Sequence, residues 1–488
     1  MRKNSRTYIL WLFPMFTFLF TGKQVVSQIN SSLFIKPDNF YAQIYNPGYF
    51  RSDEAVAFSF AGFAGASFIN QGNFEIADVI TLNANNDPRV DFQNFYEASK
   101  PRNYIRQDLT LPFLFAMVPF KKGYASFYYN ENVNTYSLVH QDAIAFLNNG
   151  NIPEDYRNFN SEEIKLAGIG YREFAFGYAK PVNDFLNAGI RAKILFGAAQ
   201  ADSKDWNYGI ETSPDDEIVT LSAGGTARMM LPVPVNLRQN NSIQSVDTEN
   251  AFAKYMGEYG NPGLAVDLGF SYQNSERNFF SGAVRDLGFI RIRSNSYDVS
   301  QEDSFDFIGF DLVNAIRYPE EPGYTNSNEL VRLIKEEIRE VYQPTLEARK
   351  YTYIMPVKTV LHYHYQQSAR HIFAATSQMS FSKQNYYSVF TLSALQNWPN
   401  FQVFENLNVH NLNDITFGGG IRYVGNKAEI FAASDNLIAF YHPAENKSFS
   451  LTFGICFLLN HKKVASEEKF SPRKGKISPY LPFYEEKK

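Results

Sequence analysis

Residues 449–459, near the C-terminal end, read Phe-Ser-Leu-Thr-Phe-Gly-Ile-Cys-Phe-Leu-Leu and alternate between large apolar and small or polar side chains. Successive side chains of a β-strand point to opposite faces, so this period of two predicts a strand. One face would carry Phe453 and Phe457, and the other Thr452 and Cys456. Such a strand fits a soluble sandwich, and it equally fits a membrane barrel with lipid outside and a wet lumen inside.

The amino-acid composition narrows the class of protein. Aromatic side chains make up 16 % of the 488 residues, with 31 Tyr and 45 Phe against 3 Trp. Aromatic residues favour strands, and membrane barrels concentrate them at the two membrane interfaces. The formal charge of −4 argues against a nucleic-acid partner, which would need a basic surface. The single cysteine, Cys456, excludes an intramolecular disulfide framework and a cysteine-based zinc site.

Residues 1–27 have the features of a secretory signal peptide. Basic residues precede an apolar run over 8–20, and Val25 and Ser27 suit the −3 and −1 positions of a cleavage site. The alternative is a membrane anchor, which Pro14 and the short apolar run disfavour. No later stretch reaches about 18 uninterrupted apolar residues, so we expect the mature chain to cross a membrane only as strands.

Alternation of the same kind recurs along the chain and predicts about 14 strands, an even number as bacterial barrels require. The stretches 200–250 and 380–412 leave room for one more hairpin. The strands that we expect are 55–68, 108–119, 124–138, 164–179, 186–198, 264–273, 279–293, 357–365, 415–423, 428–436 and 449–459.

The connections between these strands are of two kinds. Tight turns such as 121–123 alternate with long connections over 139–163, 200–262, 294–350 and 437–448. Short turns at one end and long loops at the other are the layout of outer-membrane barrels. A soluble sandwich remains the alternative, but the export signal, the aromatic load and the strand length favour an all-β, antiparallel transmembrane barrel.

Charged and imidazole side chains lie on the small or polar face of several strands, where a dry core would reject them. Three of them, Glu173, Arg191 and Asp267, lie on neighbouring strands and could pair as a salt-bridge network. We therefore expect a set of side chains that face the lumen: Glu173, Arg191, Lys193, Asp267, His362, His364 and Arg422.

No catalytic, metal or cofactor site is predicted. His362 and His364 alternate on one face, but no third ligand follows at a suitable spacing, so lumen-lining histidines are the favoured interpretation. A Gly-x-Ser-x-Gly elbow is absent from the sequence, and the glycine triplet 418–420 does not precede a helix. The protein is therefore not expected to be an enzyme or to hold a cofactor.

Two stretches do not fit a regular strand. In 171–173 and 284–286, neighbouring charged residues would have to point to opposite faces. A β-bulge, or a position above the lipid boundary, would accommodate them. A further segment, 326–344, has an apolar stripe at helical spacing and a capping pair, Asn326 and Glu329, which predict a helix in an external loop.

The two ends of the mature chain are expected to lie apart from the barrel wall. Residues 28–54 could fold inward as a plug, or form a plain surface loop. Residues 460–488 carry lysine, arginine and three prolines, which predict an extended, basic, periplasmic tail. The barrel itself would then span 55–459.

Several pieces of the sequence, in their order and spacing, resemble the DUF5723 family of Bacteroidota outer-membrane proteins: 171–178, 186–197, 265–272, 285–290 and 433–437. The family is similar to the FadL-like barrels that carry hydrophobic compounds across the outer membrane. Tyr45-Asn46-Pro47 is similar to the Asn-Pro segment near their mature N-termini, although Gly48 replaces the usual alanine.

The resemblance implies a barrel of the bacterial outer membrane that passes or binds a small hydrophobic ligand. Its partners would be outer-membrane lipid and the outer-membrane insertion machinery. The alternative function is a non-transporting scaffold of an envelope secretion or assembly complex, whose partners would dock on the loops or the tail. An outer-membrane hydrolase is a distant third hypothesis.

Overall fold

The computed structural model of this chain describes residues 39–49, 55–82, 88–149, 158–160, 165–212, 218–241, 243–247, 249–273, 275, 277–308, 344–381, 386–411, 414–442 and 444–460. The predicted signal peptide lies outside these residues, as do the helix predicted over 326–344 (apart from residue 344) and the tail beyond residue 460.

The protein is an all-β, closed antiparallel barrel of 14 strands. Two positions in the wall are each shared by a pair of short strands, β1 with β2 and β18 with β19. Around the barrel the strands are β1 (Val56–Phe60) with β2 (Ala66–Gly72), β5 (Arg102–Phe120), β6 (Gly123–His140), β8 (Lys165–Pro181), β9 (Leu186–Asp202), β14 (Pro262–Gln273), β15 (Asn278–Ile292), β18 (Tyr351–Ile354) with β19 (Val357–Gln366), β20 (His371–Phe381), β21 (Tyr386–Asn397), β22 (Phe401–His410), β23 (Asp414–Val424), β24 (Ala428–Ser434) and β25 (Ser448–Leu459).

The last strand, which the alternation predicted, closes the sheet on the first. β25 pairs with β24 on one side, and with β1 and β2 on the other, where Phe457 lies opposite Phe58 and Phe453 opposite Ala66. Closure removes both free edges, which would otherwise be templates for pairing with another chain. The hairpin that 380–412 left room for is β21–β22, whereas β20 was not predicted.

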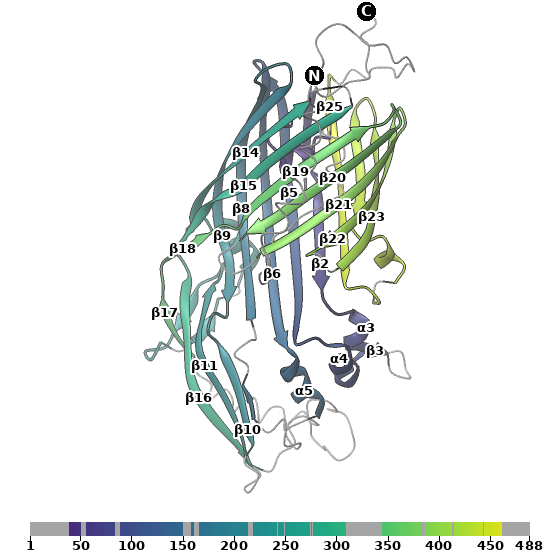
Figure 1. The fold of residues 1–488 in the computed structure, drawn as a ribbon. Coiled ribbons are helices and arrows are strands. Elements are labelled where there is room, and N and C mark those ends of the chain that lie inside the picture. Colours follow the sequence, from purple (N-terminus) through teal and green to yellow (C-terminus); the bar gives the residue numbers. More distant parts are fainter. Residues whose placement is uncertain are drawn as a thin grey trace, which may run out of the picture.

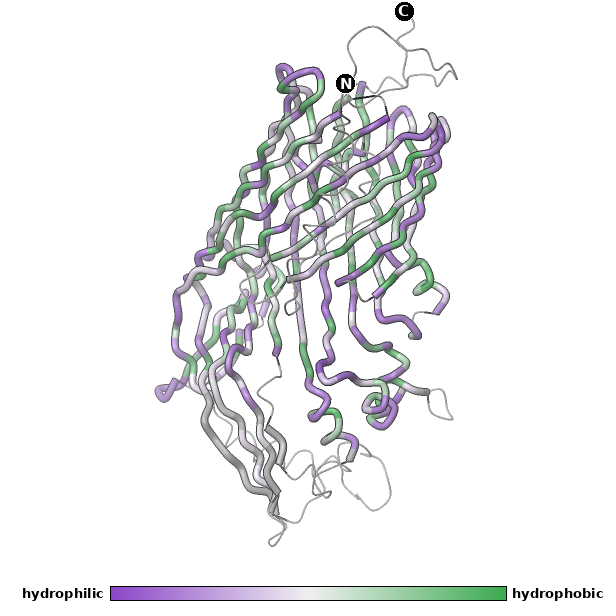
Figure 2. The backbone as a smooth tube through the Cα atoms, viewed as in Figure 1, coloured by the Kyte–Doolittle hydropathy of each residue, from purple (hydrophilic) through white to green (hydrophobic). Residues whose placement is uncertain are grey.

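Side chains alternate between the two faces of the wall, which explains the period of two in the sequence. On β9, Arg191 and Lys193 are buried and face the lumen, whereas Ile190 and Ile194 face outward and are 51 % and 41 % exposed. Figure 2 shows hydrophobic and hydrophilic residues alternating along the barrel strands. The barrel therefore presents an apolar outer belt around a polar lumen.

The first strand differs from the prediction. Residues 55–68 were expected to form one strand, but β1 ends at Phe60 and β2 begins at Ala66. The intervening residues, 61–65, which we name the wall break, include three left-handed backbones: Ala61 (φ 55°), Gly62 (φ 79°) and Gly65 (φ 110°). Glycine adopts this conformation readily, so the glycines permit the chain to leave the sheet here.

Several elements lie beyond the barrel, at the end opposite the short turns (Figure 1). β9 continues past β14 to pair with β11, which in turn pairs with β16 along its whole length. The additional strands are β3 (Ile80–Leu82), β4 (Pro88–Val90), β7 (Asn158–Asn160), β10 (Asn207–Thr212), β11 (Ile218–Met230), β12 (Val235–Leu237), β13 (Ile243–Val246), β16 (Ser296–Ile308) and β17 (Thr345–Ala348). The helices are α2 (Ala42–Tyr45), α3 (Ile76–Val79), α4 (Phe92–Ala98), α5 (Gln141–Asn149), α6 (Ala251–Gly257) and η3 (Ile438–Phe440).

The two irregular stretches are explained by different devices. In β15 the register with β14 shifts between Val266 and Leu268, and Asp286 has a positive φ of 61°, so the predicted β-bulge is confirmed there. In β8, Arg172 and Glu173 do point to opposite faces, and Arg172 faces outward. Arg172 is nevertheless 0 % exposed.

Candidate functional site

Residues 39–49, which include α2, lie inside the barrel, and we name them the inner segment. Phe40, Tyr41 and Tyr49 are each only 1 % exposed, because side chains of the barrel wall surround them. The hydroxyl of Tyr49 shares a 2.8 Å hydrogen bond with Ser281 Oγ of β15. On another part of the wall, the Tyr41 ring lies 4.2 Å from the ring of Phe431 on β24. The inner segment therefore contacts widely separated strands of the lumen.

Two paired glycines of the wall form a seat for the inner segment. Gly189 of β9 lies opposite Gly269 of β14 in the strand register. A Cβ atom at Gly189 would lie 1.8 Å from the carbonyl oxygen of Pro47, and one at Gly269 would lie 2.1 Å from Asn46 Oδ1. Neither distance is possible between non-bonded atoms. The absence of side chains is thus what allows the Asn-Pro-Gly segment to approach the wall.

Hydrogen bonds hold the segment on this seat. Asn46 Nδ2 donates to the carbonyl oxygen of Phe270 at 3.1 Å, and Ser271 Oγ donates to the carbonyl oxygen of Gly48 at 3.0 Å. Asn46 Oδ1 also accepts from the backbone N–H of Gly48 at 2.8 Å, which fixes the turn. A short polar side chain that satisfies nearby backbone groups is typical of such turns.

Arg191, one of the predicted lumen residues, joins the inner segment to the wall. Its Nη1 donates to the carbonyl oxygen of Ile44 at 2.8 Å and lies 3.0 Å from Asp267 Oδ2, and its Nη2 donates to the carbonyl oxygen of Gln43. These carbonyls belong to the last turn of α2, whose C=O groups have no partner within the helix. The side chain is 1 % exposed, so its charge depends on Asp267 for compensation.

Lys193 lies at the centre of a buried group of carboxylates. Its Nζ is 2.5 Å from Asp286 Oδ1, 2.9 Å from Asp267 Oδ2 and 3.2 Å from Glu173 Oε1. The bulge in β15 turns Asp286 toward the lumen, where Lys358 also reaches it at 3.0 Å. The predicted lumen residues on β8, β9 and β14 thus meet in one ionic cluster, beside the inner segment.

The two predicted histidines occupy a separate part of the lumen wall. His362 and His364 of β19 face inward, and their rings are 5.7 Å apart. The Nδ1 atom of His362 shares a 2.8 Å hydrogen bond with Thr376 Oγ1, and the His364 ring stacks on Phe279 at 4.8 Å. These contacts are those of side chains that pack the lumen wall.

Arg422 also faces inward, but it belongs to another group. Its Nε donates to Glu429 Oε1 at 2.7 Å, and its Nη1 donates to Gln402 Oε1 at 2.9 Å. Arg422 is 3 % exposed and lies on β23, between the strands that carry these two partners. The structure therefore does not bring it to the ionic cluster of β8, β9 and β14.

The wall break is backed by apolar side chains. Across it the regular register with β25 is lost. Ala66 lies eight positions after Phe58, but their β25 partners, Phe453 and Phe457, lie only four positions apart. On the lumen side, the hydroxyl of Tyr41 donates to the carbonyl oxygen of Phe63 at 3.2 Å. The break therefore lies directly in front of the inner segment.

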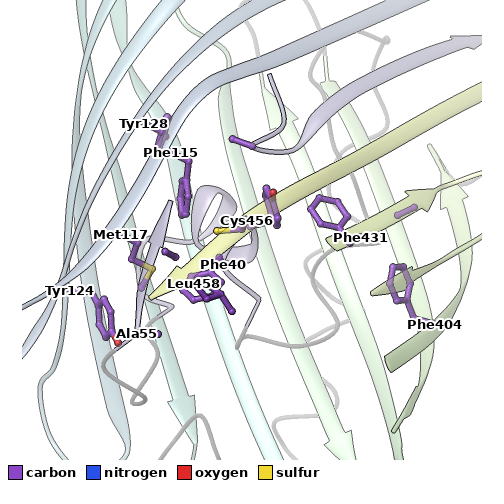
Figure 3. Close-up of a cluster of buried hydrophobic side chains, with 14 of the residues drawn as sticks. Phe40, Ala55, Phe115, Met117, Tyr124, Tyr128, Phe404, Phe431, Cys456 and Leu458 are labelled. Atoms are coloured by element: carbon purple, nitrogen blue, oxygen red, sulfur yellow. The ribbon is translucent and has the colours of Figure 1, made fainter. Parts of the chain in front are cut away.

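Behind the break lies the largest apolar cluster of the described lumen. Figure 3 shows Phe40 of the inner segment beside Cys456 and Leu458, with Phe115 of β5 on one side and Phe431 on the other. All of these side chains are 2 % exposed or less. The cluster is an apolar region within an otherwise polar lumen.

Sequence reasoning missed a polar group near the far end of the lumen. The hydroxyl of Tyr387 donates to Gln71 Oε1 and shares a hydrogen bond with His410 Nδ1, both at 2.7 Å. The guanidinium of Arg106 lies 4.6 Å from the Tyr387 ring and pairs with Asp108. A small pocket at this group leaves about 20 Å³ for the centres of water-sized molecules, which is room for about one water.

Neither a metal site nor a membrane-spanning helix is found in the part of the chain that the structure describes. No three His, Cys, Asp or Glu side chains are grouped there so as to hold a metal ion. Among the described helices, none is long and apolar enough to cross a membrane.

Solved structures of several bacterial proteins share the barrel architecture. The toluene transporter TbuX of Ralstonia pickettii is 10 % identical, with a TM-score of 0.40, over 90 % of this chain and 95 % of that chain. A FadL homologue of Pseudomonas aeruginosa is 9 % identical, with a TM-score of 0.44, over 90 % of this chain and 100 % of that chain. The toluene transporter TodX of Pseudomonas putida is 7 % identical, with a TM-score of 0.37, over 90 % and 98 %.

Similarities of this size carry no conclusion about ligands. No curated protein matches the chain by sequence. The family to which the sequence pointed does match, because the model of DUF5723, described as a family of unknown function, covers residues 47–435. This range includes the glycine seat, the ionic cluster and the wall break. The protein therefore belongs to the DUF5723 family.

Proposed function

We propose that this protein is a barrel of the bacterial outer membrane that binds or passes a small hydrophobic ligand through the wall break. The inner segment would control access by occupying the lumen side of the break. The apolar cluster around Phe40 and Phe115 would contact the ligand.

The observation that carries the proposal is the position of the break. Over residues 61–65 the regular register with both neighbouring strands, β5 and β25, is interrupted, although the backbone N–H of Ile455 on β25 still donates to the carbonyl oxygen of Phe63 at 2.8 Å. Apolar side chains of the inner segment and of several barrel strands, among them β5, β24 and β25, form the cluster behind it. A ligand of low polarity could move between this cluster and the membrane without crossing the charged part of the lumen.

The membrane location is supported by the outer belt and the signal sequence. Outward-facing residues in the middle of the strands are large and apolar, as the exposed fractions of Phe176 (53 %), Ile190 (51 %) and Leu268 (47 %) illustrate. Exposing such side chains to water is unfavourable, and a belt of them is typical of a lipid-facing barrel. Residues 1–27 supply the expected export signal.

Polar groups in the lumen argue against a wide aqueous pore. The inner segment fills the lumen beside β8, β9 and β14, together with Arg191, Lys193 and their carboxylate partners. This filling also suits the second candidate function, a scaffold of an envelope complex, because a scaffold does not need an open lumen. The projecting sheet of β10, β11 and β16 would give such a scaffold a docking surface.

Purification of the native protein from outer membranes in mild detergent separates the two functions. The transport proposal predicts that mass spectrometry of an organic extract finds a small hydrophobic compound at a constant ratio to the protein. The scaffold proposal predicts a stoichiometric partner protein instead. If neither is found, and the protein floats with the outer-membrane fraction, both proposals lose their support.

A further inference from the structure

An ion pair on the outer wall of the barrel is completely covered. Glu131 of β6 lies opposite Arg172 of β8 in the same register and on the same face as Phe127 and Phe176, and Phe176 is 53 % exposed. Both charged side chains therefore point away from the lumen. Arg172 is nevertheless 0 % exposed and Glu131 5 %.

The cover is formed by residues 249–261, which include α6 and which we name the outer strap. Arg172 Nη1 donates to the carbonyl oxygen of Met256 at 2.8 Å, and its Nη2 donates to that of Tyr255 at 3.0 Å. Carbonyls at the end of a helix lack partners within the helix, and a cation there is favourable. Arg172 thus caps the C-terminus of α6 from the barrel wall.

Glu131 completes the attachment of the outer strap. It accepts from Arg172 Nε at 2.8 Å and from the hydroxyl of Tyr255 at 2.7 Å, one bond at each carboxylate oxygen. The hydroxyl of Tyr129 on β6 also donates to it, at 2.6 Å. A pair of opposite charges with this many hydrogen bonds is compensated even where water is excluded.

Aromatic rings extend from the outer strap around the wall. The Tyr259 ring of the strap meets Phe196 of β9 edge-on at 5.0 Å, and Phe196 meets Phe174 of β8 at 6.1 Å. Phe174 stacks on Tyr129 at 4.7 Å, and Tyr129 stacks on Phe113 of β5 at 5.6 Å. Rows of aromatic side chains are typical of the membrane interface in barrels.

The height of this row of aromatic rings on the barrel wall is the height expected for a membrane–water interface. Phe196 lies ten residues along β9 from Leu186, which begins the strand directly after a short turn. About 9–11 tilted residues cross the apolar part of a membrane. Between these two ends, Ile190 and Ile194 face outward and are exposed. The outer strap therefore lies at the edge of the apolar belt on the side of the long connections.

One large apolar side chain of the outer strap is left mostly exposed by the described residues. Phe252 is 77 % exposed, although it lies three and four residues before Tyr255 and Met256 on the same side of α6. Its neighbour Lys254 pairs with Asp247 at 2.5 Å, so the strap also has a charged side. A short helix with one apolar and one charged side suits the boundary between lipid chains and headgroups.

We infer that the outer strap is an interfacial anchor, which buries Phe252 among the acyl chains of the lipid leaflet at the long-connection end of the barrel. The inference rests on the proposed membrane location. Lipid is the occupant that the surface favours, because Phe252 continues a belt whose other exposed side chains would face lipid. The ion pair of Arg172 and Glu131 then sets the depth of the strap by fixing α6 to the wall.

Spin labels test this directly, since the sequence holds one cysteine and Cys456→Ser would make every introduced cysteine unique. Labels at Phe252→Cys, at Ile194→Cys in the belt and at Ser245→Cys in β13 would be compared in lipid vesicles for collision with oxygen, which concentrates in lipid, and with a soluble nickel complex. The inference predicts that position 252 resembles position 194 and differs several-fold from position 245.

Each contrary result is recognisable. A label at 252 that collides with nickel as often as the label at 245 overturns the anchor, and so does a label shielded from both reagents, as a second copy or another protein would cause. A nickel-accessible label at 194 would overturn the membrane location as well. If Cys456→Ser fails to fold, a single tryptophan placed in turn at positions 252, 194 and 245, with Trp206→Phe and Trp398→Phe and with Trp11 in the predicted signal peptide, gives the same comparison when quenched by brominated lipid.

Discussion

Arg191 Nη1 donates a 2.8 Å hydrogen bond to the carbonyl oxygen of Ile44, so a charged side chain of the wall holds the backbone of the inner segment. The same guanidinium is compensated by Asp267 at 3.0 Å. The ionic cluster and the inner segment are therefore one structural unit. A change to the cluster is expected to alter what occupies the lumen.

Replacing Arg191 with methionine should both destabilise the barrel and release the inner segment. Removing one partner of a buried ion pair typically costs about 3–5 kcal/mol, and Lys193 would offset part of this by remaining near Asp267. Ion conductance in planar bilayers should rise. Lys358→Met is the matched control, because Lys358 pairs with Asp286 of the same cluster. Equal conductance of the two variants would contradict the role of Arg191 in holding the segment.

The glycine seat gives a sharper test of the contact between wall and inner segment. Gly189→Ala would place a Cβ atom 1.8 Å from the carbonyl oxygen of Pro47, so the segment must move. Gly170→Ala is a suitable control, because the nearest atom to its Cβ would lie at 3.8 Å. Limited proteolysis in detergent should cleave near residues 39–49 in the first variant only. Identical cleavage in both variants would show that the seat is not needed.

Closure by β25 predicts that its outer face tolerates no charge. Phe457 stacks on Phe58 at 5.6 Å and on Phe60 at 5.7 Å across the closing strand pair. Phe457→Asp would place a carboxylate on the lipid-facing side and remove these contacts, so assembly should fail, whereas Phe457→Leu should assemble. The measurement is the heat-dependent gel mobility of the barrel in isolated outer membranes. Normal amounts of the aspartate variant would refute the closure.

The outer strap should loosen only in strong alkali. Burial, and then the hydrogen bond to Glu131, raise the pKa of Tyr255 well above its ordinary value near 10. A raised pKa means that the contribution to stability is complete below the unfolded value and is lost as the pH rises through the folded value. A spin label at position 252 should keep its mobility from neutral pH to about pH 10. Loosening of the label within that range would contradict the attachment, and so would an unchanged mobility after Tyr255→Phe.

The sequence predicted the barrel because its strands carry their own signal. Alternation along 186–198 and 449–459 is local, and the two faces of a barrel wall differ in polarity, so most strands could be found alone, although β20 was not. The same alternation assigned Arg191 and Lys193 to the lumen face, and both side chains are buried in the structure. The resemblance to DUF5723 is likewise confirmed by the family match.

Features that depend on several strands could not be found in this way. The wall break is a run of phenylalanine, alanine and glycine that also suits a strand, and only the positive φ angles around Gly62 distinguish it. Arg106 meets Tyr387, which in turn bonds to His410, although hundreds of residues separate Arg106 from both in sequence. The outward direction of Arg172 depends on the strand register and on a cover, the outer strap, that no local pattern specifies.

The central claim, that a small hydrophobic ligand uses the wall break, is tested most directly by deleting residues 62–65. Between Phe58 and Ala66 this strand has four more residues than the facing stretch of β25. Deleting residues 62–65 would therefore restore one continuous register with β25. Uptake of radiolabelled toluene, as a small hydrophobic probe, would be measured in cells that carry the wild-type chain, this deletion, or a control deletion of 238–241 between β12 and β13. The account predicts saturable uptake with the wild type and the control, and its loss with an assembled 62–65 deletion. Undiminished uptake through that deletion would contradict the claim.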